Sequence, residues 1–547
     1  MNLLKNKLLY TGLIALIFVF QSCDLDINVD PNNPSVATPN QLLPTTQVRI
    51  ANSLGSGSIG ISNGASVWMH QNVQRTSFDQ YGVTGTAYSI TNAWDESYTA
   101  LKDLESIISA ATATSGTKYA GIAKILKAYL YSEMVDTWGD IPFTEANKGS
   151  SVPYPKFDDD ATIYPALLKL IDEGIADLAK TDAGVFINTS DLIYNGDATK
   201  WRKFAKTLKL KLLTNTRLVS NVSADAQVLV TEGDLIGSTD DFELVYGTNT
   251  TPENRNPGYL NDYPNGRTNY CSPYFFEIMT GQNTFSHGND LMSGIVDPRI
   301  PYYFFNQKKK GQAAENPSEY VNEVGSGGRF ISIFFGSKGK NQGFDQAGSQ
   351  TMPGLYFAGG KYDDNSGGKV GTSSGKGNVS LRMLPYYNRM YLQAELALVG
   401  TTSGDAKAFF TTAMNATFSK LNAIATADGS PTIASADVTA YINKVLALYD
   451  AGDNSKKLEI IMTQKWIASY GFALDAYTDY RRTGYPKLYD PATDDPKAYA
   501  AAGAIPDFTS RERDYPWSYP WKLTDLTLNK NAPQQKIIST YKIFWMK

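Results

Sequence analysis

The chain has 547 residues and a formal net charge of −4; 42% of its residues are hydrophobic, 12% aromatic and 19% charged. This composition is typical of a globular protein and lacks the basic excess that a nucleic-acid binder needs for phosphate contacts. Only two histidines and two cysteines occur (His70, His287, Cys23 and Cys271), which excludes a disulfide scaffold, a four-cysteine zinc site and a two-histidine zinc helix.

The first 22 residues have the layout of a secretory signal peptide. Lys5 and Lys7 supply the positive start, and Leu13 to Phe20 form an almost continuous apolar run. The uncharged stretch is too short to cross a bilayer, which needs about 20 residues. We therefore expect residues 1–22 to be removed and the protein to be exported.

Cys23 follows this run and is preceded by Ser22, an arrangement that resembles a bacterial lipobox. Phe20 and Gln21 depart from the usual leucine and small residue, and the alternative is an ordinary signal peptide followed by a cysteine by chance. We expect lipid attachment at Cys23, because two or three acyl chains, at about 0.8 kcal/mol per buried CH₂, anchor a protein to a membrane. Cys271 then has no disulfide partner and is expected to be a small core or loop residue.

Residues 23–39 form an acidic stretch, with an acid or asparagine at every second position from Asp24 to Asn32. A calcium loop is excluded because no turn glycine and no distal glutamate follow at the required spacing. Two compatible interpretations remain. The stretch is a solvated tether, or it is a sorting signal, since acids just after a lipidated cysteine resemble the surface-export signals of some Gram-negative lipoproteins.

Four pairs of helices are predicted from apolar residues that recur every three or four positions. In the first pair, Trp94 and Leu101 mark one helix and Ile122 and Tyr129 mark the next, with a short turn between them. Hairpins of this length, with Ala, Tyr, Leu and Trp at the contacts, indicate a tetratricopeptide-like stack. The predicted pairs are Ile90–Ala113 with Lys118–Trp138, Thr162–Leu178 with Ala198–Val219, Leu384–Val399 with Asp405–Leu421, and Ala436–Tyr449 with Lys456–Arg481.

The segment from about 237 to 380 is rich in Gly, Asn, Pro, Ser and Tyr and has few helical patterns. Because a structureless loop of this length is uncommon in a compact domain, we expect irregular structure that packs on the helical stack. The proline-rich stretch 483–522 is expected to be loop-like again. The expected fold class is mainly α, with helical pairs in about 90–220 and 384–482 and this irregular segment, within a single domain spanning 40–547.

Three local motifs suggest chemistry, and each has a simpler explanation. Gly55–Gly60 fits the dinucleotide-binding pattern GxGxxG but follows a helical pattern instead of a strand, so a turn is expected. Gly371–Gly375 fits the hydrolase pattern GxSxG but lies in Gly/Ser-rich sequence. Asp158–Asp160 precedes a helix, and acidic residues stabilise the N-terminus of a helix. No catalytic residue, metal or cofactor is expected, although carboxylates that are close only in space keep a surface glycosidase open as an alternative.

The aromatic residues favour binding over catalysis. The chain has 34 Tyr, 24 Phe and 8 Trp, many of them in predicted loops. A flat ring with a polar tip suits a sugar, which has an apolar C–H face and a hydroxyl rim, and it equally suits a peptide, a partner protein or the core. Helical patterns place Trp94, Trp138, Trp201 and Trp466 in the core. The ligand-binding candidates, all expected in loops, are Trp68, Tyr81, Tyr88, Tyr259, Tyr263 and Tyr270.

Several short motifs, in order along nearly the whole chain, together resemble the SusD/RagB family of nutrient-binding outer-membrane lipoproteins. One departure is Asp514–Trp521, where Trp517 and Trp521 replace more usual polar residues. The motifs are Cys23–Pro34, Ala128–Phe143 with its Trp-Gly-Asp-Ile-Pro turn, Asp297–Arg299, Gln464–Ile467, Tyr480–Pro486, Arg511 and Arg513 with Tyr515-Pro516, Leu528-Asn529, and Ile543–Trp545.

The resemblance implies a function as well as a fold. A SusD-like protein caps a SusC-type TonB-dependent transporter, with its helical repeats against the barrel and an oligosaccharide held by its loops, and it closes as a hinged lid. It is lipid-anchored in the outer membrane, faces outward and has no catalytic activity. Two alternatives stay open: a RagB-like peptide-binding lipoprotein, and a structural adaptor of the transporter. Solvent-facing loop aromatics favour a ligand-binding protein, and buried ones favour the adaptor.

Overall fold

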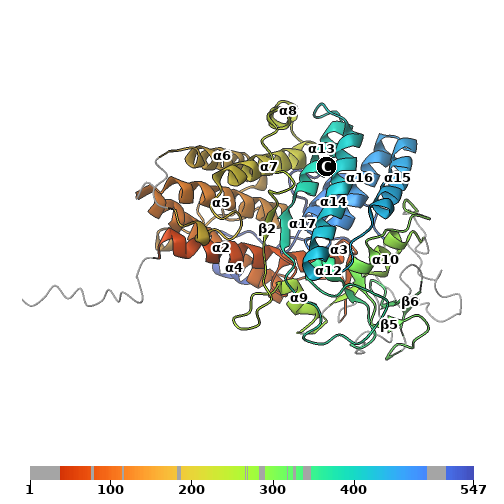
Figure 1. The fold of residues 1–547 in the computed structure, drawn as a ribbon. Helices are drawn as coiled ribbons and strands as arrows, with labels where there is room; N and C mark the ends of the chain where they lie inside the picture. Colours follow the sequence, from red (N-terminus) through yellow and green to blue (C-terminus); the bar gives the residue numbers. More distant parts are fainter. Residues whose placement is uncertain are drawn as a thin grey trace, which may run out of the picture.

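The computed structural model describes residues 37–75, 79–113, 116–181, 186–264, 266–267, 269–282, 290–316, 318–323, 328–336, 347–489 and 513–547. The predicted signal peptide, Cys23, most of the tether and His287 lie outside these ranges. The described chain is mainly helical, with long helices stacked side by side and a loop-rich part with short strands below one end of the stack (Figure 1). The predicted fold class is confirmed.

The first two predicted helical pairs are present, with ends within a turn of the predicted ones. α5 is the central helix, because it packs against both α4 and α6 and most of its residues are buried. It approaches α6 closely at a pair of glycines: a Cβ on Gly121 would lie 2.9 Å from the carbonyl oxygen of Gly174. These helices are α4 (Tyr88–Ala113), α5 (Thr117–Trp138), α6 (Asp160–Leu178) and α7 (Ala198–Thr216).

Aspartates begin several helices, because a side-chain carboxylate accepts N–H groups that have no partner in the first turn. Asp159 accepts from the amide of Ala161 at 3.0 Å, and Asp197 accepts from that of Thr199 at 2.9 Å. Asp158, beside Asp159, accepts from the amide of Thr144 at 2.8 Å. The structural interpretation of the Asp158–Asp160 run is therefore confirmed.

In the second half of the stack, one predicted helix is wrong. Residues 456–481 form two helices instead of one, because the chain turns at Gly471, which has a φ of 105°. A side chain at Gly471 would also meet the carbonyl oxygen of Phe357 at 2.5 Å. The helices are α13 (Tyr386–Leu398), α14 (Ala406–Asp428), α15 (Ser435–Ala451), α16 (Asn454–Ala468) and α17 (Leu474–Thr483).

In the first half of the chain, α2, α3 and α8 lie outside the four predicted pairs, although the sequence has a helical pattern before Gly55. α2 (Pro39–Leu54) lies along α4, although it contains Pro44 and buries polar as well as apolar residues. One of these is Gln47, whose side-chain amide donates to Asp191 at 2.7 Å. The turn Gly55–Gly60 joins α2 to α3, as expected. α3 spans Ile61–Trp68 and α8 spans Ser223–Glu232.

The described part of the middle segment is irregular, as predicted, and its strands, with β1 and β9 from outside it, form four small antiparallel sheets among the described residues. The pairings are β1 with β3, β2 with β9, β4 with β8, and β7 between β5 and β6. Cys271 on β3 is buried and free, which confirms its expected place in the core. The strands are β1 (Asn72–Gln74), β2 (Phe242–Leu244), β3 (Asn269–Cys271), β4 (Phe304–Phe305), β5 (Lys308–Lys309), β6 (Tyr320–Asn322), β7 (Gly328–Ser332), β8 (Met352–Pro353) and β9 (Leu381–Leu384), and the short helices are α9 (Pro257–Asp262), α10 (Pro273–Thr280), α11 (Ile300–Tyr303) and α12 (Leu355–Ala358).

Residues 513–547, the C-terminal segment, lie against the ends of α4 and α5. Apart from the short α18 (Leu523–Leu528), this segment has no regular secondary structure and is held by side chains and by single backbone hydrogen bonds. The indole N–H of Trp138 donates to the carbonyl oxygen of Pro520 at 3.1 Å, and that of Trp545 donates to Asp136 at 2.8 Å. Trp545 is fully buried, so the segment is part of the core.

A network of buried charges joins five helices of the stack. Lys211 of α7 contacts Glu133 of α5 and lies 2.6 Å from Asp475 of α17. On the next turn of α17, Asp479 lies 2.7 Å from Lys465 of α16. Three more charges continue the network: Glu395 of α13 contacts Arg482 of α17 and lies 2.6 Å from Arg217.

We expect Lys211→Met to lower the free energy of unfolding by about 3–5 kcal/mol, because it leaves two buried carboxylates without their cation. Denaturant unfolding followed by circular dichroism measures this change. Lys407→Met is the matched control: Lys407 pairs with Asp450 at 2.7 Å, but both side chains are about half exposed. The control should lose less than about 1 kcal/mol. Equal losses in the two variants would contradict a structural role for the buried network.

Candidate functional site

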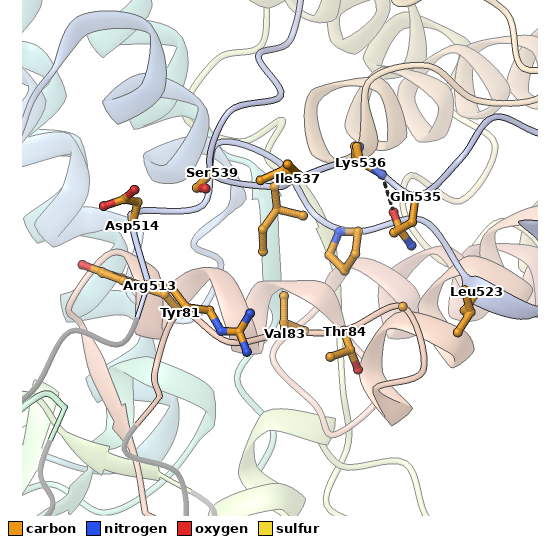
Figure 2. Close-up of a pocket in the computed structure, with 13 residues that line it drawn as sticks. Tyr81, Val83, Thr84, Arg513, Asp514, Leu523, Gln535, Lys536, Ile537 and Ser539 are labelled. Atoms are coloured by element: carbon orange, nitrogen blue, oxygen red, sulfur yellow. Dashed lines mark hydrogen bonds between the residues drawn. The ribbon is translucent and has the colours of Figure 1, made fainter.

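A pocket of about 680 Å³ lies between the loop 79–87 and the C-terminal segment. In Figure 2, Tyr81, Val83 and Thr84 form one side of this pocket, and Gln535, Lys536, Ile537 and Ser539 face them from the other side. Arg513 and Asp514 lie at one end and Leu523 at the opposite end. The lining mixes apolar side chains with hydroxyl, amide and charged groups, which is the character of a small-molecule site.

The loop 79–87 is held in place from both sides. On the side of α3, the indole N–H of Trp68 donates to the carbonyl oxygen of Gln80 at 3.1 Å. From the C-terminal segment, the amide of Leu523 donates to the carbonyl oxygen of Gly85 at 3.0 Å. An ion pair of 2.7 Å between Asp79 and Arg513 joins the loop and the C-terminal segment at the end of the pocket. The pocket is therefore formed by two segments that are distant in sequence.

Lys536 anchors the C-terminal wall. Its ammonium group donates to the carbonyl oxygen of Trp138 and lies 4.4 Å from the ring centre of Trp521 and 4.2 Å from that of Tyr541. Burial among these groups lowers the pKa of Lys536 well below its usual range. Because its ammonium group is held between two rings and a carbonyl, Lys536 has a structural part in the wall.

Aromatic rings pack beneath the pocket floor. The ring of Tyr81 lies 5.1 Å from that of Phe335 and 5.4 Å from that of Tyr515, and its hydroxyl hydrogen-bonds with Nε2 of His70 at 3.1 Å. His70 is fully buried and stacks on Phe335 with a centroid distance of 4.1 Å. Burial lowers the pKa of His70 to about 3, so this histidine is neutral at physiological pH.

The structure brings one of the six candidate aromatics, Tyr81, to the described lining of this pocket. Tyr88, the first residue of α4, is 66% exposed. The other four are buried, and Tyr81 itself is only 5% exposed. The expectation that the candidates lie in loops is wrong for Trp68, Tyr88, Tyr259 and Tyr270. Trp68 ends α3, Tyr259 lies in α9 and donates to the carbonyl oxygen of Ser374, Tyr263 donates to that of Pro353, and Tyr270 lies on β3.

Sequence reasoning missed most of the lining residues, among them Thr84, Asp514, Gln535 and Ser539. No local motif marks them, because they belong to two segments that meet only in the folded chain. Arg513 was noted only as part of a family motif. Among the described residues, no group of three or more His, Cys, Asp or Glu side chains could hold a metal ion. No helix in the described part of the chain is both long and apolar enough to span a bilayer.

A comparison with models of known protein families finds a match over most of the chain. Residues 31–507 match the family model SusD-like, described as starch-binding and associating with the outer membrane. The chain belongs to the SusD-like family. This is a family of nutrient- and carbohydrate-binding outer-membrane proteins. No match is found among curated protein sequences.

Solved structures share the SusD-like fold along nearly the whole chain. A SusD homologue from Bacteroides fragilis is 19% identical, with a TM-score of 0.67, over 93% of this chain and 99% of that chain. A SusD/RagB family protein from Bacteroides thetaiotaomicron is 21% identical, with a TM-score of 0.65, over 93% and 99%. A chitin-binding SusD homologue from Flavobacterium johnsoniae is 18% identical, with a TM-score of 0.60, over 92% and 98%.

We expect the free energy of unfolding to depend on pH through His70. Below pH 6.5 the unfolded chain binds a proton at this histidine, whereas the folded chain does so only near pH 3. Stability is therefore lost as the pH falls from 6.5 towards 3, by about 2 kcal/mol at pH 5. His70→Gln removes this dependence. Denaturant unfolding at pH 7.5 and pH 5 should show a smaller difference for this variant than for the wild type.

Tyr81→Phe is the control for this measurement, because it removes the hydroxyl partner but keeps the buried imidazole. It should retain the wild-type loss of stability between the two pH values. An identical pH dependence in His70→Gln and the wild type would contradict a neutral, buried His70 as its source.

Proposed function

We propose that this protein captures an oligosaccharide at the pocket between the loop 79–87 and the C-terminal segment. The observation that carries the proposal is the pocket itself, which has about 680 Å³ of space and a mixed apolar and polar lining. Hydroxyl and amide groups at Thr84, Gln535 and Ser539 match a sugar rim, and Val83 and Ile537 match an apolar sugar face. The exposed ring of Tyr88, three residues after the lining residue Gly85 in sequence, is a further candidate for stacking on a sugar.

Chitin oligosaccharides are the first ligands to test. Two of the similar solved structures are described as chitin-binding, at 20% and 18% identity. At this identity the likeness supports the fold alone, so the sugar is part of the proposal. The N-acetyl groups of chitin would add amide donors and acceptors for the polar lining.

We further propose that the protein is anchored through Cys23 to the outer membrane, faces outward, and delivers its ligand to a SusC-type TonB-dependent transporter as a hinged lid. A ligand drives such a closure only if it binds the closed state more tightly than the open one. The support is the family membership and the lipobox-like sequence. A lid crosslinked shut against the transporter that still allows uptake would overturn this mechanism.

A structural adaptor of the transporter is the second candidate function. It is favoured by the burial of five of the six candidate aromatics, since a buried ring offers little face to a ligand. A RagB-like peptide-binding function is favoured by the charged end of the pocket at Arg513 and Asp514. The ligand panel below separates these functions from oligosaccharide capture.

We expect Thr84→Trp to weaken oligosaccharide binding at least tenfold, because the indole would fill the pocket. Isothermal titration of soluble protein starting at Asp24, with chitin oligosaccharides first and then other oligosaccharides and oligopeptides, measures the affinity. The same mixtures are tested for reaction products, and we expect none.

Thr86→Trp is the matched control, because Thr86 is also exposed and lies outside the described pocket lining. The two threonine hydroxyls are 3.0 Å apart, so either variant loses the same hydrogen bond. The control should bind within twofold of the wild type. Binding of peptides alone would favour the RagB-like function, and binding of no ligand, with a barrel protein co-purifying from membranes, would favour the adaptor. Equal binding by both variants would place the ligand elsewhere.

A further inference from the structure

A second cavity, of about 330 Å³, lies beside α14 and shares no described lining residue with the pocket between the loop 79–87 and the C-terminal segment. It is enclosed by the chain after β2, by α12, by β9 and by the C-terminal half of α14. Much of its lining is apolar, including Tyr246, Leu355 and Ile424. Its edge is open to solvent, because Val245 is 65% exposed and Ala427 is exposed.

Three charged residues line the cavity, and they differ in whether they form an ion pair with another residue of the chain. Lys420 already has two carboxylates, since it lies 2.9 Å from Asp241 and 2.7 Å from Glu243. Asp428 lies 3.3 Å from Lys376, which leaves this acid with a cation of its own. Without a ligand, Lys420 and Lys376 therefore each already have at least one carboxylate.

Arg382 is the lining cation without such a partner. Its side chain is buried, and no carboxylate among the described residues forms an ion pair with it. Glu243 is its neighbour in the register of β2 and β9 and interacts with it electrostatically, but the ion pair of Glu243 is with Lys420. Arg382 instead donates to the carbonyl oxygens of Tyr470 at 2.8 Å and Ser380 at 3.4 Å, and its guanidinium lies over the ring of Tyr356 at 4.1 Å.

Glu243 acts on Arg382 only as a nearby charge shared with Lys420, and the five N–H donors of a guanidinium form a fork that matches a carboxylate. Two backbone acceptors use only part of that fork. The rest of the cavity offers apolar surface, which an inorganic anion would leave unfilled. The combination therefore suits a molecule that has a carboxylate at one end and an apolar body of a few carbon atoms at the other.

We propose that this cavity binds a small carboxylate with an apolar body, with the carboxylate at Arg382 and the body between Tyr246, Leu355 and Ile424. The volume of 330 Å³ is at the lower end of the range for small-molecule sites, so it accepts one apolar residue of a peptide end or one short organic acid. The site is separate from the oligosaccharide pocket and does not rest on the function proposed there.

The test uses three probes of matched shape, titrated into the soluble protein and followed by calorimetry. N-acetyl-leucine carries the carboxylate, N-acetyl-leucinamide replaces it by an uncharged amide, and 4-methylpentanoate keeps the carboxylate and the apolar body without the peptide group. N-acetyl-leucine should bind saturably and at least tenfold more tightly than the amide. If 4-methylpentanoate binds as tightly as N-acetyl-leucine, the site takes apolar acids in general; if it binds more weakly, the site takes peptide ends. Either result supports the proposal.

Replacing the buried Arg382 risks unfolding the protein, so the variant is made at the exposed edge. Ala427→Glu places a negative charge on the cavity wall and should weaken binding of N-acetyl-leucine at least tenfold. Thr426→Glu is the matched control, because Thr426 is the exposed neighbour on α14 and lies outside the described lining; it should bind within twofold of the wild type. Equal binding of the acid and the amide, no saturable binding of any probe, or equal effects of the two variants would overturn the proposal.

Discussion

The arrangement of the helices depends on the buried charges carried by α17. Asp475, Asp479 and Arg482 lie on one face of this short helix and contact cations or anions from α7, α13 and α16. Buried charges are tolerated only when each has a partner at close range, so the relative positions of these helices are fixed more tightly than apolar packing alone would fix them. Burial acts to raise the pKa of Glu395, but Arg482 and Arg217 outweigh it and hold this pKa at about 2.

The same helix supports the wall of the pocket. Arg481 of α17 donates to the carbonyl oxygens of Asp136 and of Trp517 at 2.5 Å and 2.9 Å, and the hydroxyl of Tyr477 donates to that of Pro516 at 2.7 Å. One face of α17 thus joins the helices of the stack, while neighbouring residues hold the C-terminal segment. The pocket wall has no regular structure of its own over most of its length, and it is positioned by the rigid helix behind it.

Long helices could be predicted from the sequence, because an apolar stripe at helical spacing is a local signal. The break at Gly471 could not, because the run from Lys456 to Arg481 keeps a helical pattern and the turn depends on the carbonyl oxygen of Phe357, far away in sequence. The helical pattern before Gly55 was recognised, but α2 was not assigned to a helical pair, since Pro44 and buried polar residues interrupt its apolar stripe. The aromatic candidates were chosen by residue type, which does not distinguish a ring that faces ligand from one that fills the core. Asp79 and Arg513 meet across 434 residues, and no local pattern reports such a contact.

This separation in sequence determines when the pocket can form. A chain that is synthesised from its N-terminus presents the loop 79–87 long before the residues that complete the pocket. Contacts of this sequence separation form late, since the loop between them must close first. A chain synthesised only through α5 can therefore build the α4–α5 hairpin but has no second wall for its pocket. The pocket is complete only once the chain extends through residue 539, so its two walls are made at opposite ends of synthesis.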